Sequence, residues 1–387
     1  MQQDKRSRIF IIMEKLKKII KEYCPPVSLA LFIFAVVAAV VQLISELSVP
    51  FSDFFNRYIG SFFRGLMAML TNLLPFSLAE CIIVSLPLLF VVIIVLCVKR
   101  VHRSTRSGTR YLVGLASVVA VMYSMFVMTT AVAYNGSTLS AKLGLEQRPV
   151  SVEELRLTAE YMIERMDEEL DEINFRYGSS SVMPYSVSEM NDKLLEAYDR
   201  LSEKYPFVPR LWSRVKQVSL SELMTYTHMS GMYTYYTGEA NLNINFPDYN
   251  LPYTAAHELA HQRGILPENE ANFIAFLVCC ESDDPYIRYS GYLNMYEYLN
   301  SALYSADYDT FAEVYSSLDV RVIYEMRAYN AFFDKYKDNV AANVSSTLND
   351  TYLKAQGQTA GEKSYGMVVD LAVAYVLGES AVTEADR

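Results

Sequence analysis

The sequence lacks a framework of spaced cysteines and contains little histidine. Of its five cysteines, Cys279 and Cys280 are adjacent, and adjacent cysteines rarely bond to each other. The other three lie in or beside apolar runs. The folded part must therefore depend on its core rather than on disulfides. Only four histidines occur in 387 residues, which makes two of them at a ligand spacing informative.

Basic side chains are scarce in the second part of the chain. Residues 135–387 carry a net charge of −18, whereas residues 1–134 carry +8. The acidic part has no basic stripe that could neutralise phosphates, which excludes nucleic acid as its partner. The split indicates two physical environments, an apolar and basic front followed by a polar, acidic globular part.

Long uncharged apolar runs occur three times in the front part, at about 27–47, 79–98 and 111–133. Crossing a bilayer takes about 20 residues. A buried helical hairpin is disfavoured because three such runs are hard to bury in a soluble domain. A cleaved signal peptide is disfavoured because its apolar region is shorter, about 7–15 residues. Residues 1–134 are therefore predicted to be a membrane anchor, a bundle of three transmembrane helices in the lipid bilayer.

The positions of the basic residues predict the orientation. One basic cluster precedes the first run and another separates the second from the third, and both should stay cytoplasmic. The chain is then a multi-pass cell-membrane protein with a cytoplasmic N-terminus and an extracytoplasmic domain at 135–387. The outer loop 48–77 is rich in Phe and Leu, which fits a helix at the membrane interface or one packed on the spans.

Helical signals dominate the globular part. Ser151 and Glu154 form a capping box before a helix that ends at about residue 173, and a second helix is expected at 186–204. The Tyr- and Thr-rich stretch 232–245 indicates one or two short strands. Helical periodicity follows from residue 253 onward. The predicted fold class is mainly α with a small β-sheet, an α+β domain.

A candidate metal-binding motif lies in this helical region, at His257-Glu258-Leu-Ala-His261. A spacing of four places both imidazoles on one helix face, where both can reach one Zn²⁺ at about 2.0–2.1 Å. Glu258 follows the first ligand, so its carboxylate points at the attacking water and can act as a general base. The alternative is an ordinary core helix with hydrogen-bonded histidines.

A catalytic zinc site needs a third protein ligand. Gly264 permits a turn, and the helix expected after Pro267 carries Glu268 and Glu270. Glu268 is preferred as the ligand, because Asn272 one turn later would then lie behind a ligand histidine and orient its ring. Glu270 stays the alternative, and for either carboxylate a solvated position in the first helical turn is possible.

His257-Glu258-x-x-His261 followed by Glu268-x-x-Ala-Asn272 resembles the gluzincin branch of the zinc metallopeptidases. Only six residues separate His261 from Glu268, fewer than in familiar gluzincins, and Pro267 stands where metzincins have their third ligand. Nearly the whole chain resembles an uncharacterised bacterial family of three-span membrane proteins with a zincin-like domain. The segments that carry this second resemblance are 237–241, 257–264, 288–292, 349–354 and 363–366.

The resemblance implies an edge strand before the site helix, along which a peptide substrate pairs. The segment 238–245 is the candidate, with an ordinary buried strand as the alternative. Its predicted substrate-binding residues are Gly238, Glu239, Ala240 and Asn241. An oxyanion donor is also needed, and Tyr289 is preferred over Arg288, Tyr292 and Tyr365.

The function expected from these observations is hydrolysis of peptide bonds by a membrane-anchored zinc metallopeptidase. Its partner would be a peptide or protein substrate at the outer membrane face. A catalytically silent zincin-like module that binds a peptide or an envelope polymer and uses zinc only structurally is the alternative. A latent protease gated by a partner or by the chain's own tail is a third possibility.

Overall fold

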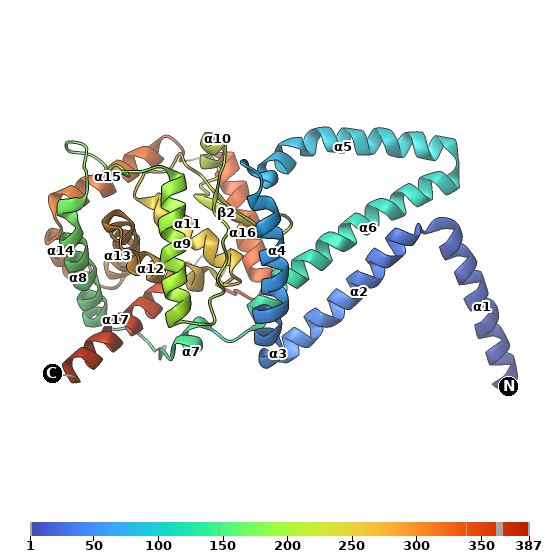
Figure 1. Cartoon of the computed structure of the whole chain (residues 1–387), viewed down its shortest axis with the longest axis horizontal. Coiled ribbons are helices and arrows are strands. Elements are labelled where there is room, and N and C mark those ends of the chain that lie inside the picture. Colours follow the sequence, from blue (N-terminus) through green and yellow to red (C-terminus); the bar gives the residue numbers. More distant parts are fainter. Residues whose placement is uncertain (1, 147, 338, 361–366, 386–387) are drawn as a thin grey trace.

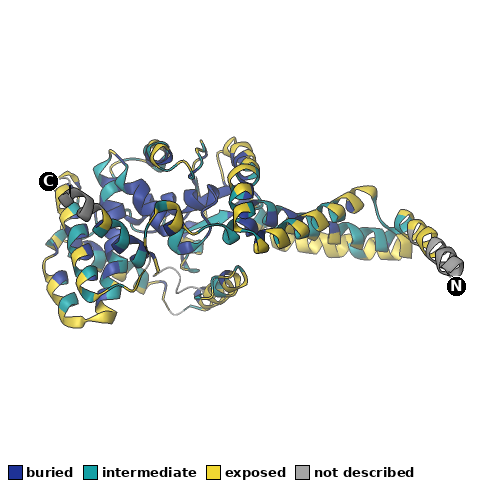
Figure 2. Cartoon of the chain, turned by 90° about the horizontal axis from the view of Figure 1, so that it is seen from below, coloured by how far each residue is buried: buried dark blue, intermediate teal, exposed yellow. Residues whose placement is uncertain are grey.

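Three long helices follow the predicted apolar runs. The computed structural model describes residues 2–146, 148–337, 339–360 and 367–385, with α2 at Pro26–Leu47, α5 at Leu78–Arg103 and α6 at Thr105–Thr129. Each is long and apolar enough to cross a membrane. They project together from one side of the globular part (Figure 1) and expose most of their apolar surface (Figure 2). The first two predicted spans agree closely with these helices. The third prediction began late and ran past the helix end at Thr129.

One helix precedes the spans and several short ones connect them to the globular part. The first is α1 (Gln2–Tyr23), which lies before α2. Between α2 and α5 lie α3 (Val49–Phe54), the π-helix η1 (Phe55–Gly60) and α4 (Ser61–Asn72), and the 3₁₀ helix η2 (Ala131–Asn135) follows α6.

One face of α4 is packed and the other is exposed. The helix contacts α6 and elements of the globular part. On its packed face the buried Arg64 guanidinium donates to the Thr129 carbonyl at 2.8 Å and to Asn56 Oδ1 at 2.7 Å. Phe62 and Leu70 lie on the exposed face. Packing on the spans is thus confirmed for one face, and the apolar opposite face keeps the character expected of an interfacial helix.

The globular part is mainly helical, as predicted. Both early helices begin with capping boxes, at Ser151 with Glu154 and at Ser186 with Glu189. The 3₁₀ helix η3 (Leu170–Glu172) extends the first of them. The helices are α7 (Leu139–Leu143), α8 (Val152–Glu169), α9 (Val187–Lys204), α10 (Ser221–Thr225), α11 (Asn250–Gln262), α12 (Glu268–Cys280), α13 (Pro285–Ala306), α14 (Tyr308–Ser316), α15 (Val320–Asp334), α16 (Val340–Ala355) and α17 (Val368–Ala385).

Helix α11 lies at the centre of the globular part. Every one of its residues is buried, and it packs against α12, α13 and the sheet. Gly264 follows it with φ +89°, and the Ile265 N–H donates back to the Ala260 carbonyl at 3.1 Å. Glycine adopts this left-handed conformation without strain, which allows the chain to turn at once into α12. The short connection keeps α11 and α12 side by side.

A three-stranded sheet covers one side of α11. Its strands are β1 (Lys216–Gln217), β2 (Gly231–Thr234) and β3 (Glu239–Leu242), in the spatial order β1-β3-β2. β3 pairs in parallel with β1 and antiparallel with β2. The prediction of strands in this region is confirmed, but the prediction of 238–245 as an edge strand is wrong, because β3 is central and already paired on both sides. Strand β2 is the edge that faces α11.

Candidate metal centre

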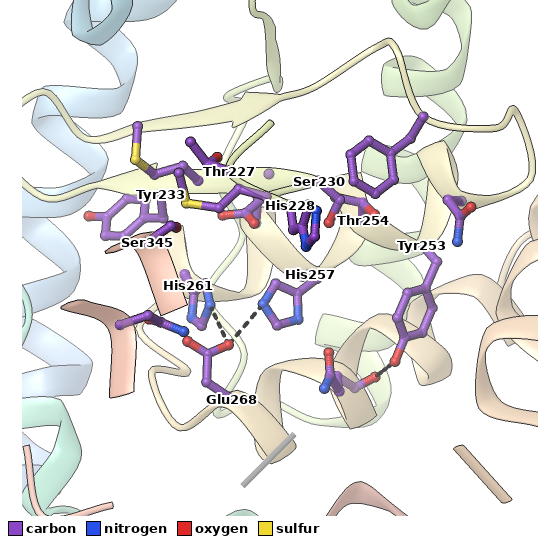
Figure 3. A pocket seen from close by; sticks show the side chains of 18 of the residues that line it. Thr227, His228, Ser230, Tyr233, Tyr253, Thr254, His257, His261, Glu268 and Ser345 are labelled. Carbon is purple, nitrogen blue, oxygen red and sulfur yellow. Dashed lines mark hydrogen bonds and ion pairs between the residues drawn. The ribbon is translucent and has the colours of Figure 1, made fainter. Parts of the chain in front are cut away.

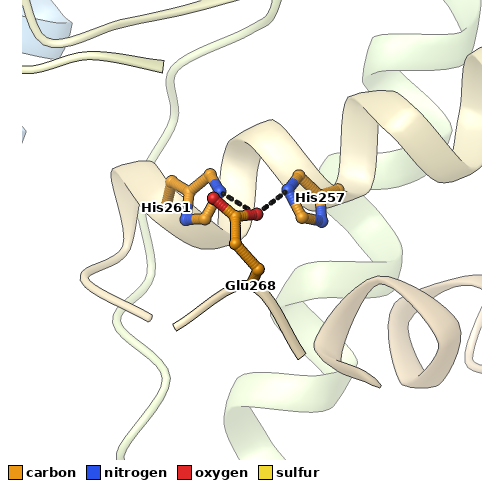
Figure 4. Close-up of side chains that lie close together, drawn as sticks. All are labelled: His257, His261 and Glu268. Carbon is orange, nitrogen blue, oxygen red and sulfur yellow. Dashed lines mark ion pairs between the residues drawn. The ribbon is translucent and has the colours of Figure 1, made fainter. Parts of the chain in front are cut away.

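The two histidines of α11 and the first residue of α12 converge on one point (Figure 4). His257 Nε2 lies 3.2 Å and His261 Nε2 lies 3.5 Å from Glu268 Oε2. All three side chains are buried, and one possible ligand atom from each lies within 4.8 Å of the other two. The i, i+4 spacing aligns the rings, and the turn at Gly264 brings α12 back so that its first side chain meets them.

The protonation pattern of His261 favours a cation at this point. Its Nδ1 lies 2.9 Å from the Ile265 carbonyl oxygen. A carbonyl oxygen can only accept a hydrogen bond, so Nδ1 carries a proton. In the neutral ring, Nε2 then carries a lone pair. That lone pair faces Glu268 Oε2, which has no hydrogen-bond partner among the described residues. Burial lowers the pKa of His261, but the Glu268 carboxylate outweighs it and raises the pKa to about 9. A positive charge, a proton or a metal ion, is therefore favoured between these groups.

The separations fit a small tetrahedral ion. Bonds of about 2.0–2.1 Å in tetrahedral geometry hold ligand atoms about 3.3–3.4 Å apart. The two His–Glu separations, 3.2 and 3.5 Å, bracket that value. Two imidazole nitrogens and one carboxylate are the donor set typical of catalytic zinc sites in other proteins, where a fourth position is kept for water or substrate.

Glu258 is buried beside this cluster and faces strand β2. The backbone of Tyr233 hydrogen-bonds its carboxylate, while Oε2 has no partner among the described residues. Burial, the largest effect, raises the pKa of the Glu258 carboxyl above its ordinary value. A higher pKa makes the carboxylate a stronger proton acceptor, as a general base requires.

Gly231 of β2 leaves the space that Glu258 occupies. A Cβ at this position would lie 2.4 Å from Glu258 Oε1 and 2.6 Å from its Cγ. Gly231→Ala is therefore expected to push the carboxylate aside. If Glu258 is the base of a hydrolase, this variant should lower kcat by about 100-fold, the cost of an approximately 1 Å misplacement of a catalytic group. Zinc content and the thermal unfolding temperature should stay near those of the parent, because no predicted ligand moves.

That experiment needs a glycine control with open space around it and no left-handed backbone. Gly378 of α17 is exposed and a Cβ there would meet nothing within 4 Å, so Gly378→Ala tests only the backbone effect of the substitution. If Gly231→Ala had the same kcat as the parent, Glu258 would not depend on β2 for its position.

The cluster lines a cavity of about 1010 Å³. Figure 3 shows His257, His261 and Glu268 at one wall of this cavity, with Tyr233 of β2 and Ser345 of α16 also at its lining. Helices α11, α12, α13 and α16, strand β2 and the chain that follows α6 all contribute lining residues. The space is large enough for a stretch of polypeptide.

Of the two candidate third ligands, the structure brings Glu268 and not Glu270 to the histidines. Glu270 Oε1 instead accepts the Leu139 N–H at 2.7 Å, at the start of α7. Its first-turn position on α12 turns it toward the linker that follows the spans. The preference for Glu268 agrees with this geometry.

Asn272 lines the cavity but does not orient a histidine ring through a described hydrogen bond. Its Nδ2 donates to the Tyr298 hydroxyl at 3.1 Å, and its backbone carbonyl accepts from the Tyr253 hydroxyl at 2.9 Å. His257 Nδ1 is buried without a hydrogen-bond partner among the described residues. The predicted role of Asn272 behind a histidine is therefore corrected: it positions two tyrosines of the cavity wall.

Tyr289 lies outside the cavity lining, which contradicts its prediction as oxyanion donor. Its hydroxyl donates to Glu325 Oε2 at 3.1 Å, and the side chain is fully buried in the core. Arg288 makes a two-point ion pair with Glu169, and Tyr292 is likewise absent from the cavity lining. Tyr365 lies outside the described residues.

The predicted substrate-binding residues hold the sheet to α5 instead. The Glu239 carboxylate accepts the backbone N–H groups of Leu78 and Ala79 at the N-terminus of α5. A negative charge is stabilising at a helix N-terminus. Asn241 Oδ1 accepts the Ser77 hydroxyl at 2.6 Å. Ala240 of the same strand is fully buried. These residues are structural because their polar groups are used in joining the globular part to a membrane-type helix.

Gly238 is also structural. Its φ of +71° makes the turn between β2 and β3, and its carbonyl accepts the Gln262 amide at 2.7 Å. Gln262 follows the histidine motif, so the end of α11 is tied to the sheet through this bond. None of the segment 238–241 lines the cavity.

Sequence reasoning missed most of the cavity wall. On α13, Asn294, Glu297, Tyr298 and Ser301 all line it. Their spacing of three, four and seven residues places them on one face of α13, a signal that was readable in the sequence. The cavity-lining residues of α16 had no such signal. The local sequence of a mainly exposed helix does not indicate against which other element the helix will pack.

Comparison with known proteins gives a family and no activity. Fold and site together define a mainly helical protein with three membrane-type helices and a buried His–His–Glu cluster in a large cavity. Residues 55–373 match the model of a family described as a protein of unknown function, DUF3810, and the chain belongs to this family. No curated protein and no solved structure matches.

Proposed function

We propose that this chain is a membrane-anchored zinc-dependent metallopeptidase. His257, His261 and Glu268 would hold the ion, and Glu258 would act as general base. The observation that carries the proposal is the convergence of three buried ligand atoms within 4.8 Å of one another, beside a buried carboxylate and a cavity of about 1010 Å³. A structural zinc site has no use for a base at that position.

The chain's own residues supply most of the chemistry. Zinc, when bound, would polarise the scissile carbonyl as a Lewis acid. Glu258, held by the backbone of Tyr233, takes a proton from the attacking water and passes it to the leaving amine. The His261 ring is kept in one tautomer by the Ile265 carbonyl, which leaves Nε2 free to coordinate.

The free edge of β2 is the proposed place for the substrate backbone. Gly231, Met232 and Tyr233 line the cavity, and β2 pairs on one side only among the described residues. Glu258 already uses the Tyr233 N–H of this edge. An extended peptide would therefore add through the remaining main-chain groups of the edge, which bind it with little dependence on its side chains. β2 thus takes the role first expected of the segment 238–245.

Full-length protein purified in detergent tests the proposal. It should bind about one zinc per chain, the number one three-ligand site holds, and cleave members of a peptide library. Removing the metal with a chelator should abolish cleavage, and added zinc should restore it. A chain that binds zinc but leaves every peptide intact would support the silent binding module instead.

The orientation follows the basic loops and has its own test. The proposed domain lies on the outer side, as the positive-inside rule indicates for clusters before α2 and between α5 and α6. Protease added to intact cells should then degrade the part after residue 134 and spare the N-terminus. Protection of the domain in intact cells, with digestion after lysis, would reverse the topology.

A further inference from the structure

A partly buried carboxylate on the cavity wall has no basic partner among the described residues. Glu297 lies on the same face of α13 as Asn294 and Tyr298, and one of its oxygens accepts the Tyr249 hydroxyl at 3.0 Å. Among the described residues, no Lys or Arg lines the cavity, and none forms an ion pair with Glu297. A carboxylate removed from water is costly unless a positive charge or several donors compensate it. Burial therefore raises the pKa of this carboxyl to about 7, with the charge of Glu325 adding to the effect.

A second acceptor on the cavity wall, on the residue that follows Tyr249, lacks a donor. Asn294 Nδ2 donates to the Ser290 carbonyl at 2.8 Å, so Asn294 presents its Oδ1 to the neighbouring amide. Asn250 Nδ2 donates to that oxygen at 3.1 Å, which leaves Asn250 Oδ1 as an acceptor. This oxygen is buried without a hydrogen-bond partner, on a side chain that is 6% exposed and lines the cavity. Unsatisfied buried acceptors of this kind indicate a ligand that brings donors.

Tyrosine rings line the same cavity as these acceptors, among them Tyr253, Tyr298 and Tyr329. Burial first, and then the charge of Glu297, raise the pKa of Tyr298 and of Tyr329, which places both rings near the carboxylate. A carboxylate and a carbonyl oxygen in a cavity that tyrosine rings also line suit a cation that carries several N–H donors.

We propose that Glu297 and Asn250 form a subsite for a cationic group, an ammonium or a guanidinium, of the polypeptide that enters the cavity. The inference rests on the proposed peptidase function for the identity of the ligand as a polypeptide, but the binding step does not require catalysis. The cation comes from a Lys or Arg side chain or from a free N-terminus. Either source satisfies the Asn250 oxygen and the Glu297 charge at once.

Peptide binding to the full chain in detergent, carrying Glu258→Gln so that nothing is cleaved, tests this subsite. The probes are two fluorescent peptides that differ at one position, lysine in one and norleucine in the other. Each peptide is made with a free and with an acetylated N-terminus. Binding of each peptide is titrated at pH 8 and measured by fluorescence anisotropy. A peptide with a cation should bind at least about 10-fold more tightly than its fully neutral counterpart, the scale of a charged hydrogen bond. Glu297→Gln should erase that difference.

The control removes the same charge from an exposed position. Glu313 of α14 is exposed, and Glu313→Gln should leave the preference unchanged. The neutral peptide should bind Glu297→Gln as tightly as the parent, which shows that the cavity is intact. A preference lost on acetylation identifies the N-terminal ammonium, and one that persists identifies the side chain.

Two results would overturn the subsite: equal affinity for cationic and neutral peptides, or a cation preference that survives Glu297→Gln. Failure of the peptidase proposal looks different. In that case the parent chain cleaves no peptide while the binding difference and its dependence on Glu297 persist. Conversely, cleavage without any cation preference would contradict the subsite alone.

Discussion

Glu258→Gln is expected to lower kcat by about 100- to 10,000-fold, the range that a positioned general base contributes. Glutamine has nearly the same shape, so it still fits the space beside Gly231, but its amide oxygen takes up no proton at neutral pH. Glu258 is not one of the three converging ligands, and the zinc content should therefore stay at the parent's value. Turnover of a library-derived peptide and zinc analysis of the same preparation are the two measurements.

The combination of the two readouts makes this test specific. A variant that loses zinc and activity together would show that Glu258 supports the metal site rather than the proton transfer. A variant as active as the parent would remove Glu258 as the base. Thermal unfolding in the same detergent checks that neither result comes from a disrupted core.

Glu268→Gln is expected to weaken zinc binding by more than about 100-fold, since loss of even a supporting partner of a ligand costs about 10- to 100-fold. The substitution removes the negative charge that lies 3.2 Å from His257 Nε2 and 3.5 Å from His261 Nε2. Without it the site has two neutral donors and an amide, a weak ligand for zinc. Competition with a chelator of known affinity measures the change.

Glu270→Gln is the matched control on the same helical turn. Its carboxylate accepts the Leu139 N–H and not a histidine, so zinc affinity should stay within a factor of a few of the parent's. Any cost should be in stability, about 1–2 kcal/mol for a weakened hydrogen bond to a charged group. Equal losses of zinc in both variants would show that helix α12 as a whole, rather than the Glu268 ligand, supports the site.

The elements that local sequence predicted best are those whose signal lies within one segment. The span α2 agrees with its prediction because an uninterrupted apolar run needs no partner to be recognised. The capping box of Ser151 with Glu154 was predicted because Ser and Glu three residues apart satisfy each other locally, and the box of Ser186 with Glu189, which was not predicted, has the same local signal. The signal for the cluster of His257, His261 and Glu268 is also local. A helical spacing aligns the two histidines, and a connection of only six residues brings the glutamate to them.

The incorrect predictions concern contacts between distant segments. β3 was expected to be an edge, but its outer neighbour β1 is only Lys216–Gln217, a two-residue strand without any periodicity of its own. Tyr289 follows the ligand helix closely in sequence, yet its hydroxyl bonds Glu325, which comes from α15. Glu239 looked like part of a substrate motif and instead caps α5, about 160 residues earlier in the chain.

The amino-acid sequence alone determined the apolar spans, the charge asymmetry, the helix starts and the ligand spacing, because each arises from residues within a few turns of one another. Tertiary structure alone decided that β2 is the open edge, that Glu258 packs on Gly231, and that Glu297 lines a cavity without a basic partner. The physical reason is that strand order, burial of charge and enclosure of a cavity depend on which distant segments pack together. The free energy of that packing is summed over the whole core and is not encoded in any single segment.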